Sequence, residues 1–237
     1  MKSVTVALLA YKEEDNLKVL LPKIHEQIEK VTTDYEILVV DTEKPLDHTE
    51  EVCRKFGARY VNQEEDGFGG AFRTAIRYAD KELFLILDSD GSHDPSRIPV
   101  MYRYYLEGGY DLVIGSRYVK GGKTSDSPTS IIMSKILNGV YRIILGIKAH
   151  DISTDYRLYN TAQLKSVKLT HQYYDILQEV LVKLSLNKHD FKIGEIPISF
   201  TKRMFGESKR KLIPFIFSYI KTLFELIVLK YRKRRER

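Results

Sequence analysis

The feature of this sequence that most restricts its fold is a regular alternation of short apolar runs and longer amphipathic segments. The apolar runs are too short for typical helices and fit buried strands, whereas the segments between them repeat apolar residues at helical spacing. Parallel strands joined by helices produce this alternation. The sequence therefore predicts an α/β fold, with a mostly parallel, twisted sheet and helices on both faces. The expected strands are 3–10, 35–41, 58–62, 83–87 and 111–115, and the expected helices are 13–30, 46–56 and 67–79.

Two carboxylates follow the fourth expected strand. Asp88 and Asp90 stand one residue apart at its C-terminal end, and Gly91 and Ser92 continue the chain as a turn. In open α/β sheets ligands bind at this end of the strands, and paired carboxylates there suit a hard divalent cation held against a phosphate. The alternative is an acidic, solvated turn, which is common after strands.

The ends of the first two strands are also acidic. The first strand runs into Tyr11, Lys12 and Glu13, and the second ends at Asp41. Each acid alone could be a helix N-cap, but their coincidence on successive strands favours one binding crevice. The glycine turn at 66–71 predicts a close backbone approach to a nucleotide or sugar, with a plain tight turn as the alternative. A dinucleotide fingerprint would instead follow the first strand.

Charge and cysteine content narrow the functional classes. The formal net charge is +6, but the last eight residues hold six bases and one acid, so most of the excess lies in the tail. This distribution argues against nucleic-acid binding by the whole domain and favours a local contact with an anionic surface. Cys53 is the one cysteine, which excludes an internal disulfide and a cysteine-based zinc site and fits a reducing, cytoplasmic setting. The N-terminus reads as a first strand rather than a signal peptide.

Two later segments, 131–147 and 213–229, are apolar on one face and interrupted by charges. Both are shorter than the roughly 20 apolar residues that span a bilayer, so they are expected to lie in a membrane interface. Basic residues from Lys230 onward would strengthen contact with anionic lipid. Core packing and a homodimer surface are the alternatives. The expected organisation is a domain over 1–211 and an amphipathic, basic membrane-associating helix and tail over 212–237.

These motifs together resemble the family 2 glycosyltransferases of GT-A fold, and among them the polyprenyl-phosphate, dolichol-phosphate mannose synthase-like branch. The segments that carry the resemblance are 7–17, 37–47, 66–76, 85–95, 114–122, 150–160 and 193–209. The resemblance implies a Rossmann-like domain that moves a hexose, mannose or glucose, from a GDP- or UDP-sugar to dolichyl or undecaprenyl phosphate. It also implies inversion, Mg²⁺ or Mn²⁺ as cofactor, and a peripheral position on the cytoplasmic face of a membrane.

The resemblance also implies roles for individual residues. The implied metal ligands are Asp88 and Asp90. The implied donor-binding residues are Ala10, Tyr11, Glu13, Asp41, Gly69, Asp88, Ser89, Asp90 and Lys209. The implied acceptor-binding residues are Arg117, Ser153, Thr154 and Arg157. The implied catalytic residues are Asp90, Arg117 and Arg203, since guanidinium groups pair well with phosphates.

The sequence departs from the family pattern at three of these places. Thr42 stands where a second acid usually follows Asp41, Ser92 where glutamine is frequent, and Asp155 where the acceptor motif usually has glycine. His93 is interpreted first as a turn residue and second as a phosphate neighbour.

Three other functions stay open. The first rival is a glycosyltransferase acting on a sugar hydroxyl, with Asp155 or Asp175 as base. The second is a degenerate nucleotide-sugar-binding module without activity. The third is a nucleotidyltransferase, although its usual loop after the first strand is missing. The absence of tryptophan excludes the signature of processive polysaccharide synthases.

Overall fold

The computed structural model describes residues 1–206 and 212–235 of the chain. The strands are β1 (Val4–Leu9), β2 (Tyr35–Asp41), β3 (Arg59–Asn62), β4 (Leu83–Ile86), β5 (Leu112–Ser116), β6 (Lys123–Thr124), β7 (Arg157–Asn160), β8 (Ile193–Pro197) and β9 (Ser199–Phe200). The α-helices are α1 (Glu14–Ile28), α2 (Thr49–Lys55), α3 (Gly67–Tyr78), α4 (Ile98–Gly108), α5 (Pro128–Leu145), α6 (Thr161–Lys165), α7 (Ile176–Asn187) and α8 (Leu212–Arg235).

The main sheet has seven strands in the order β3-β2-β1-β4-β7-β5-β8, and β6 and β9 form a small second sheet. Its strands run parallel except β7, which is antiparallel to both of its neighbours. The prediction of a mostly parallel sheet is confirmed. The central strands are also as apolar and as buried as expected, because helices cover both faces.

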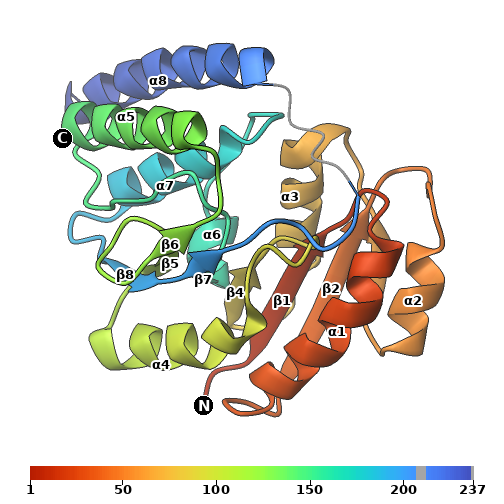
Figure 1. Ribbon diagram of the computed structural model, residues 1–237. Coiled ribbons are helices and arrows are strands. Elements are labelled where there is room, and N and C mark those ends of the chain that lie inside the picture. Colours follow the sequence, from red (N-terminus) through yellow and green to blue (C-terminus); the bar gives the residue numbers. More distant parts are fainter. Residues whose placement is uncertain (207–211, 236–237) are drawn as a thin grey trace.

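Helices lie on both faces of the sheet (Figure 1), and an apolar core fills the space on each face. One core contains side chains of α1, α2 and α4, including Cys53, which is fully buried. The other contains side chains of α3 and α7 and, further out, of α5 and α8. This arrangement leaves the C-terminal ends of β1, β2 and β4 at one edge, where the acidic strand ends predicted from the sequence gather.

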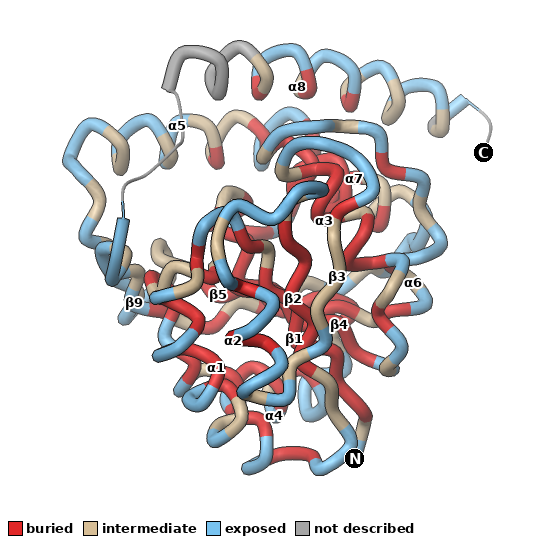
Figure 2. The backbone as a smooth tube through the Cα atoms, turned by 90° about the vertical axis from the view of Figure 1, so that its right-hand side faces the viewer, coloured by how far each residue is buried: buried red, intermediate tan, exposed pale blue. Residues whose placement is uncertain are grey.

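Helices α5 and α8 form an outer layer above α7 (Figure 1). The Tyr141 hydroxyl on α5 donates to the backbone oxygen of Tyr219 on α8 (2.9 Å). The sides that face the body are buried, whereas the outer sides are exposed (Figure 2). Exposed apolar side chains of this layer are Ile132, Met133, Ile136, Ile143, Ile144, Ile220, Phe224, Val228 and Tyr231. Among the described residues, no helix has both the length and the apolar character needed to cross a membrane.

Most expected elements differ from the observed ones by at most two residues at either end, but the helix expected at 46–56 begins three residues later, at Thr49. The reason is the side chain of Asp47, which accepts hydrogen bonds from the backbone N–H of Thr49 (3.1 Å) and of Glu14 (3.0 Å). These bonds tie the preceding segment to α1 as a loop. Strands β7 and β8 and helices α4, α6 and α7 are larger differences, because no element was expected at their positions.

Candidate active site

A cavity of about 530 Å³ opens at the C-terminal edge of the sheet. It is lined by Leu9, Ala10, Tyr11, Glu13, Thr42, Gln63, Asp66, Gly67, Phe68, Ala71, Leu87, Asp88, Ser89, Asp90, Asp155, Tyr174 and Arg203. Many of the residues expected to bind the donor are therefore brought together here. Phe68 and Tyr174 stack at one side, with ring centroids 4.4 Å apart.

Glu13 and Arg203 form an ion pair in the cavity wall. Nη2 of Arg203 donates to Oε1 of Glu13 at 2.7 Å and lies 3.8 Å from Oδ2 of Asp90. The other carboxylate oxygen of Glu13 accepts a hydrogen bond from Asn16 (2.5 Å). Burial raises the pKa of Glu13 above its usual value, although the bonds from Asn16 and Arg203 act in the opposite direction. Arg203 thus places a positive charge between the ends of β1 and β4.

Asp88, His93 and Asp155 offer ligand atoms that all lie within 4.8 Å of one another. Nδ1 of His93 is 3.3 Å from Oδ2 of Asp88 and 3.7 Å from Oδ1 of Asp155. Burial and the nearby Asp88 carboxylate raise the pKa of Asp155 well above its usual value. Burial lowers the pKa of His93, which favours the neutral imidazole. Two carboxylates this close repel each other, and a divalent cation between them would remove that repulsion.

Strand pairing explains why Asp88 and Asp155 meet. In the antiparallel β4–β7 ladder, Ile86 pairs with Arg157. Continuing that register past the end of β4 brings Asp88 opposite Asp155, although 67 positions separate them in the sequence. The two carboxylates therefore lie side by side because Asp88 follows the end of β4 and Asp155 precedes the start of the antiparallel strand β7.

His93 was interpreted from the sequence first as a turn residue, and its contacts agree with that role. Its ring packs against Tyr156 and Phe200, with centroids 4.9 and 5.3 Å away, and it is 1% exposed. Its Nδ1 accepts the backbone N–H of Asp88 at 3.1 Å. Because this bond occupies the Nδ1 lone pair, His93 holds the turn after β4 in place. A contact between a cation and Nδ1 of His93 would require that bond to break.

Asp90, expected as the second metal ligand, is not a member of the Asp88, His93 and Asp155 group. Its Oδ1 accepts the backbone N–H of Ser92 (2.9 Å), and its carboxylate faces Arg203. The pairing of Asp88 with Asp90 around a cation remains a prediction. Ser89 lies between them, and its hydroxyl donates to the backbone oxygen of Leu9 (2.6 Å), joining the ends of β1 and β4.

Two expected donor contacts do not face the cavity. Asp41 is fully buried, and its carboxylate accepts hydrogen bonds from the N–H of Thr42 (2.8 Å) and the hydroxyl of Tyr60 (3.1 Å). Thr42 lines the cavity in its place. Gly69 approaches the chain's own loop, since its N–H donates to the oxygen of Gln172 (2.9 Å) and a side chain there would overlap His171. The close backbone approach expected at Gly69 is therefore internal.

Arg117, expected to bind the acceptor, is held by acidic partners. It donates to both carboxylate oxygens of the fully buried Asp151, at 2.7 and 2.9 Å, and to Asp126 at 3.2 Å. It also donates to the hydroxyl of Ser153 (2.8 Å). Hydrogen bonds to Asp151 raise the pKa of Arg117 against the opposing effect of burial. Within the described chain, Arg117 and Ser153 bind each other and Asp151 rather than lining the cavity.

Arg157 does not fit the acceptor role expected for it. It is fully buried, and its guanidinium donates to the backbone oxygens of Thr154 (2.8 Å), Leu177 (2.8 Å) and Ile152 (2.6 Å) and to the hydroxyl of Tyr159 (3.1 Å). Thr154, another expected acceptor contact, is also buried. Both residues shape the interior beneath the cavity, because no surface of Arg157 is available to a ligand.

Two further residues considered from the sequence lie elsewhere. Asp175 is buried at the start of α7, where it accepts a hydrogen bond from Thr222 of α8 (2.6 Å), so it does not face the cavity as a base would. Asp155, the other candidate base, does line the cavity. Lys209 lies outside the described residues.

A family model described as glycosyl transferase family 2 matches residues 5–167. The chain belongs to this family. A dolichol-phosphate mannosyltransferase of Pyrococcus furiosus is 31% identical over 233 residues, which cover 94% of this chain and 63% of that protein. A polyprenol monophosphomannose synthase of Mycolicibacterium smegmatis is 30% identical over 218 residues, covering 86% of this chain and 79% of that one. The family 2 assignment made from the sequence motifs is confirmed.

Solved structures support the GT-A fold of this family 2 member. Glucosyl-3-phosphoglycerate synthase from Mycobacterium tuberculosis, in complex with Mn²⁺, UDP and glucosyl-3-phosphoglycerate, has a TM-score of 0.74 and 18% identity, covering 95% of this chain and 80% of that one. The same enzyme in complex with Mg²⁺ and UDP has a TM-score of 0.72 and 18% identity, covering 95% and 79%. The predicted fold class is confirmed.

Proposed function

We propose that this chain is an inverting, metal-dependent hexosyltransferase that moves mannose or glucose from a nucleoside-diphosphate sugar to a polyprenyl phosphate. The observation that carries the proposal is the cavity at the sheet edge, whose wall brings Glu13, Asp88, Asp155 and Arg203 together. The names of the two curated relatives, a dolichol-phosphate mannosyltransferase and a polyprenol monophosphomannose synthase, support the acceptor class.

The donor set of this cavity fits a divalent cation. Asp88 and Asp155 supply carboxylate oxygens, the ligands that Mg²⁺ and Mn²⁺ prefer, with Asp90 nearby. The complexes of the structural neighbour with Mn²⁺ or Mg²⁺ and UDP support this type of cofactor. When bound, the ion would neutralise charge that develops on the diphosphate leaving group.

The chain's own residues would orient the two substrates. Arg203 lies between Glu13 and Asp90, where its guanidinium can move from Glu13 to an anionic diphosphate. Phe68 and Tyr174 form an apolar wall, and Thr42 and Gln63 supply polar groups at the β2 and β3 ends for the nucleoside. A phosphate acceptor is already an anion, so the reaction needs its positioning rather than a base.

Association with a membrane surface is part of the proposal. The outer layer of α5 and α8 exposes Ile136, Ile143 and Phe224, which are 59%, 84% and 65% exposed, beside basic residues at the end of α8. An apolar face with adjacent cations complements an anionic lipid surface. We assign residues 1–211 to the catalytic domain and 212–237 to membrane contact, on the cytoplasmic face where nucleotide sugars are available.

Transfer can be measured by incubating the chain with labelled GDP-mannose or UDP-glucose and a polyprenyl phosphate in detergent, followed by lipid extraction. Label is expected in the lipid phase only with Mg²⁺ or Mn²⁺. Asp155→Asn should reduce both Mn²⁺ binding and transfer, by about 100-fold for transfer. Asp190→Asn, at an exposed surface position, is the matched control and should change neither. Absence of label in the lipid phase with every donor would refute the proposal.

A second candidate is transfer to a sugar hydroxyl with Asp155 as general base. It is favoured by the position of the Asp155 carboxylate in the cavity, where burial and the Asp88 carboxylate raise its pKa and so make it a stronger base than an exposed carboxylate. Labelled oligosaccharide products, with none in the lipid phase, would select this candidate. A binding module without activity would instead retain donor binding while giving no product with either acceptor.

A further inference from the structure

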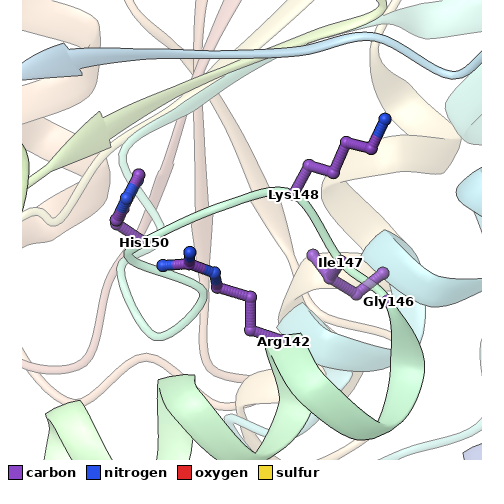
Figure 3. Close-up of a pocket in the computed structure, with 5 residues that line it drawn as sticks. All are labelled: Arg142, Gly146, Ile147, Lys148 and His150. Carbon is purple, nitrogen blue, oxygen red and sulfur yellow. The ribbon is translucent and has the colours of Figure 1, made fainter.

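A second cavity, of about 370 Å³, lies at the C-terminal end of α5. It is lined by Arg142, Gly146, Ile147, Lys148 and His150 (Figure 3). Its lining, among the described residues, is separate from that of the candidate active site. Three of the five lining residues are basic residues or histidine, so the cavity is suited to an anion.

Two of these groups point toward each other. The guanidinium of Arg142 extends toward the ring of His150, whereas the ammonium group of Lys148 points away from both (Figure 3). Glu195 fixes the histidine by accepting its Nδ1–H at 2.7 Å and its backbone N–H at 2.9 Å. Nε2 of the neutral ring then carries a lone pair, so the donors that face an anion in this cavity come from Arg142. Arg142 and His150 form the core of the cavity, and Lys148 lies at its rim.

The negative groups around this cavity already have partners. The Glu195 side chain is 9% exposed and also accepts the backbone N–H of Asp151 (3.1 Å). The carbonyl end of α5 would disfavour an anion, but Lys230 of α8 donates to the oxygen of Ile144 at 3.1 Å. The N–H of Gly146 bonds to the oxygen of Arg142 (3.0 Å). The cavity therefore keeps a positive balance despite its place at a helix C-terminus.

The same turn of α5 carries exposed apolar side chains. Ile143 follows Arg142 directly and is 84% exposed, and Ile144 is 44% exposed. An anion that is attached to hydrocarbon would contact both the guanidinium and this apolar surface, whereas a free anion would use only the charges. We propose that the Arg142 and His150 cavity binds the phosphate of a lipid headgroup at the membrane surface. This proposal rests on the membrane contact of α5 and α8 described under Proposed function.

Binding can be tested in solution with dihexanoyl phosphatidate, a short lipid phosphate used as monomers so that no bilayer charge contributes. Inorganic phosphate and dihexanoyl phosphatidylcholine are the comparison ligands, and titration calorimetry with the full chain gives the affinities. We expect dihexanoyl phosphatidate to bind about tenfold more tightly than either. Arg142→Gln should weaken this binding about tenfold, because it removes a charge-assisted, forked contact. Lys148→Gln should weaken it less than about threefold, and Arg54→Gln, on the opposite face of the sheet, should not change it.

The affinities of the two variants distinguish a specific binding site from general electrostatic attraction. Equal losses for Arg142→Gln and Lys148→Gln would refute the site, because unspecific electrostatics treats the two cations alike. Equal affinity for inorganic phosphate would refute the lipid source. A lipid phosphate can also enter the acceptor region, so only the binding that Arg142→Gln removes is counted. Hexosyl transfer in detergent should persist in Arg142→Gln, which keeps failure of this inference distinct from failure of the proposed function.

Discussion

Replacement of Arg157 by methionine should lower the free energy of unfolding by about 2–5 kcal/mol. The guanidinium donates to three backbone oxygens. The oxygen of Ile152 would keep a second donor, Nε2 of Gln178 at 2.7 Å, and the oxygen of Leu177 would keep its bond within helix α7, whereas the oxygen of Thr154 and the hydroxyl of Tyr159 would each lose a donor. Each buried acceptor that loses its donor costs about 1–3 kcal/mol. Methionine fills much of the same volume, so the cost of a cavity should be small.

Urea denaturation followed by circular dichroism measures this loss, and thermal unfolding should shift down by roughly 5–15 °C. Arg54→Met, at an exposed position on α2, is the matched control and should change stability by less than about 0.5 kcal/mol. Arg157→Lys keeps the charge but cannot reach the same three oxygens, so it should also destabilise the fold. If Arg157→Met keeps its stability to within about 1 kcal/mol and loses acceptor affinity, the structural role assigned to Arg157 is wrong.

Three further outcomes follow from the structure. Gly69→Ala should lower stability by about 1–3 kcal/mol and weaken donor binding, because the new methyl group overlaps the backbone of His171. Gly139→Ala is its control, since open space surrounds that position in α5, and it should be neutral or stabilising by up to about 1 kcal/mol in urea denaturation. Burial acts to raise the pKa of Glu179, but hydrogen bonds from His171, Lys183 and Thr170 outweigh it and hold that pKa well below its usual value. The stability supplied by Glu179 is therefore complete above about pH 5 and is lost as the pH falls below about 4. Burial acts to lower the pKa of its partner His171, but the bonds to Glu179 outweigh burial and raise that pKa. The stability supplied by His171 is therefore complete below about pH 6 and is lost as the pH rises through the pKa of the folded state. The stability difference between wild type and Glu179→Gln, measured by urea denaturation across pH, should be greatest between about pH 5 and 6. A difference that does not vary with pH would contradict this assignment.

The strand and helix alternation predicted most of the sheet, because buried parallel strands leave apolar runs that are visible in a single sequence. Strand β7 could not be predicted in the same way. It has four residues, Arg157–Asn160, and begins and ends with polar side chains. Its position between β4 and β5 is determined by pairing with two strands that are distant in the sequence, not by a local pattern.

The part of the site that lies at the C-terminal ends of strands could be predicted from the sequence. Glu13, Asp88 and Ser89 line the cavity because the C-terminal ends of β1 and β4 are neighbours. The positions of His93 and Asp155 in the site depend on contacts between residues that are distant in the sequence. His93 packs against Tyr156 and Phe200, and Asp155 reaches Asp88 through the β4–β7 register. Arg157 shows a different limit, because a sequence cannot distinguish an arginine that faces a ligand from one enclosed by backbone oxygens.

The place of β7 in the sheet also determines when β4 and β5 can be joined during synthesis. Strands β4 and β5 do not pair with each other, and each needs β7 as its neighbour. At typical translation rates the ribosome adds the residues between the end of β5 and the end of β7 in roughly 2–9 s. Throughout that interval both strands present unpaired edges, which are sites of aggregation. The nascent chain is therefore exposed to aggregation at these two strand edges until β7 has been synthesised.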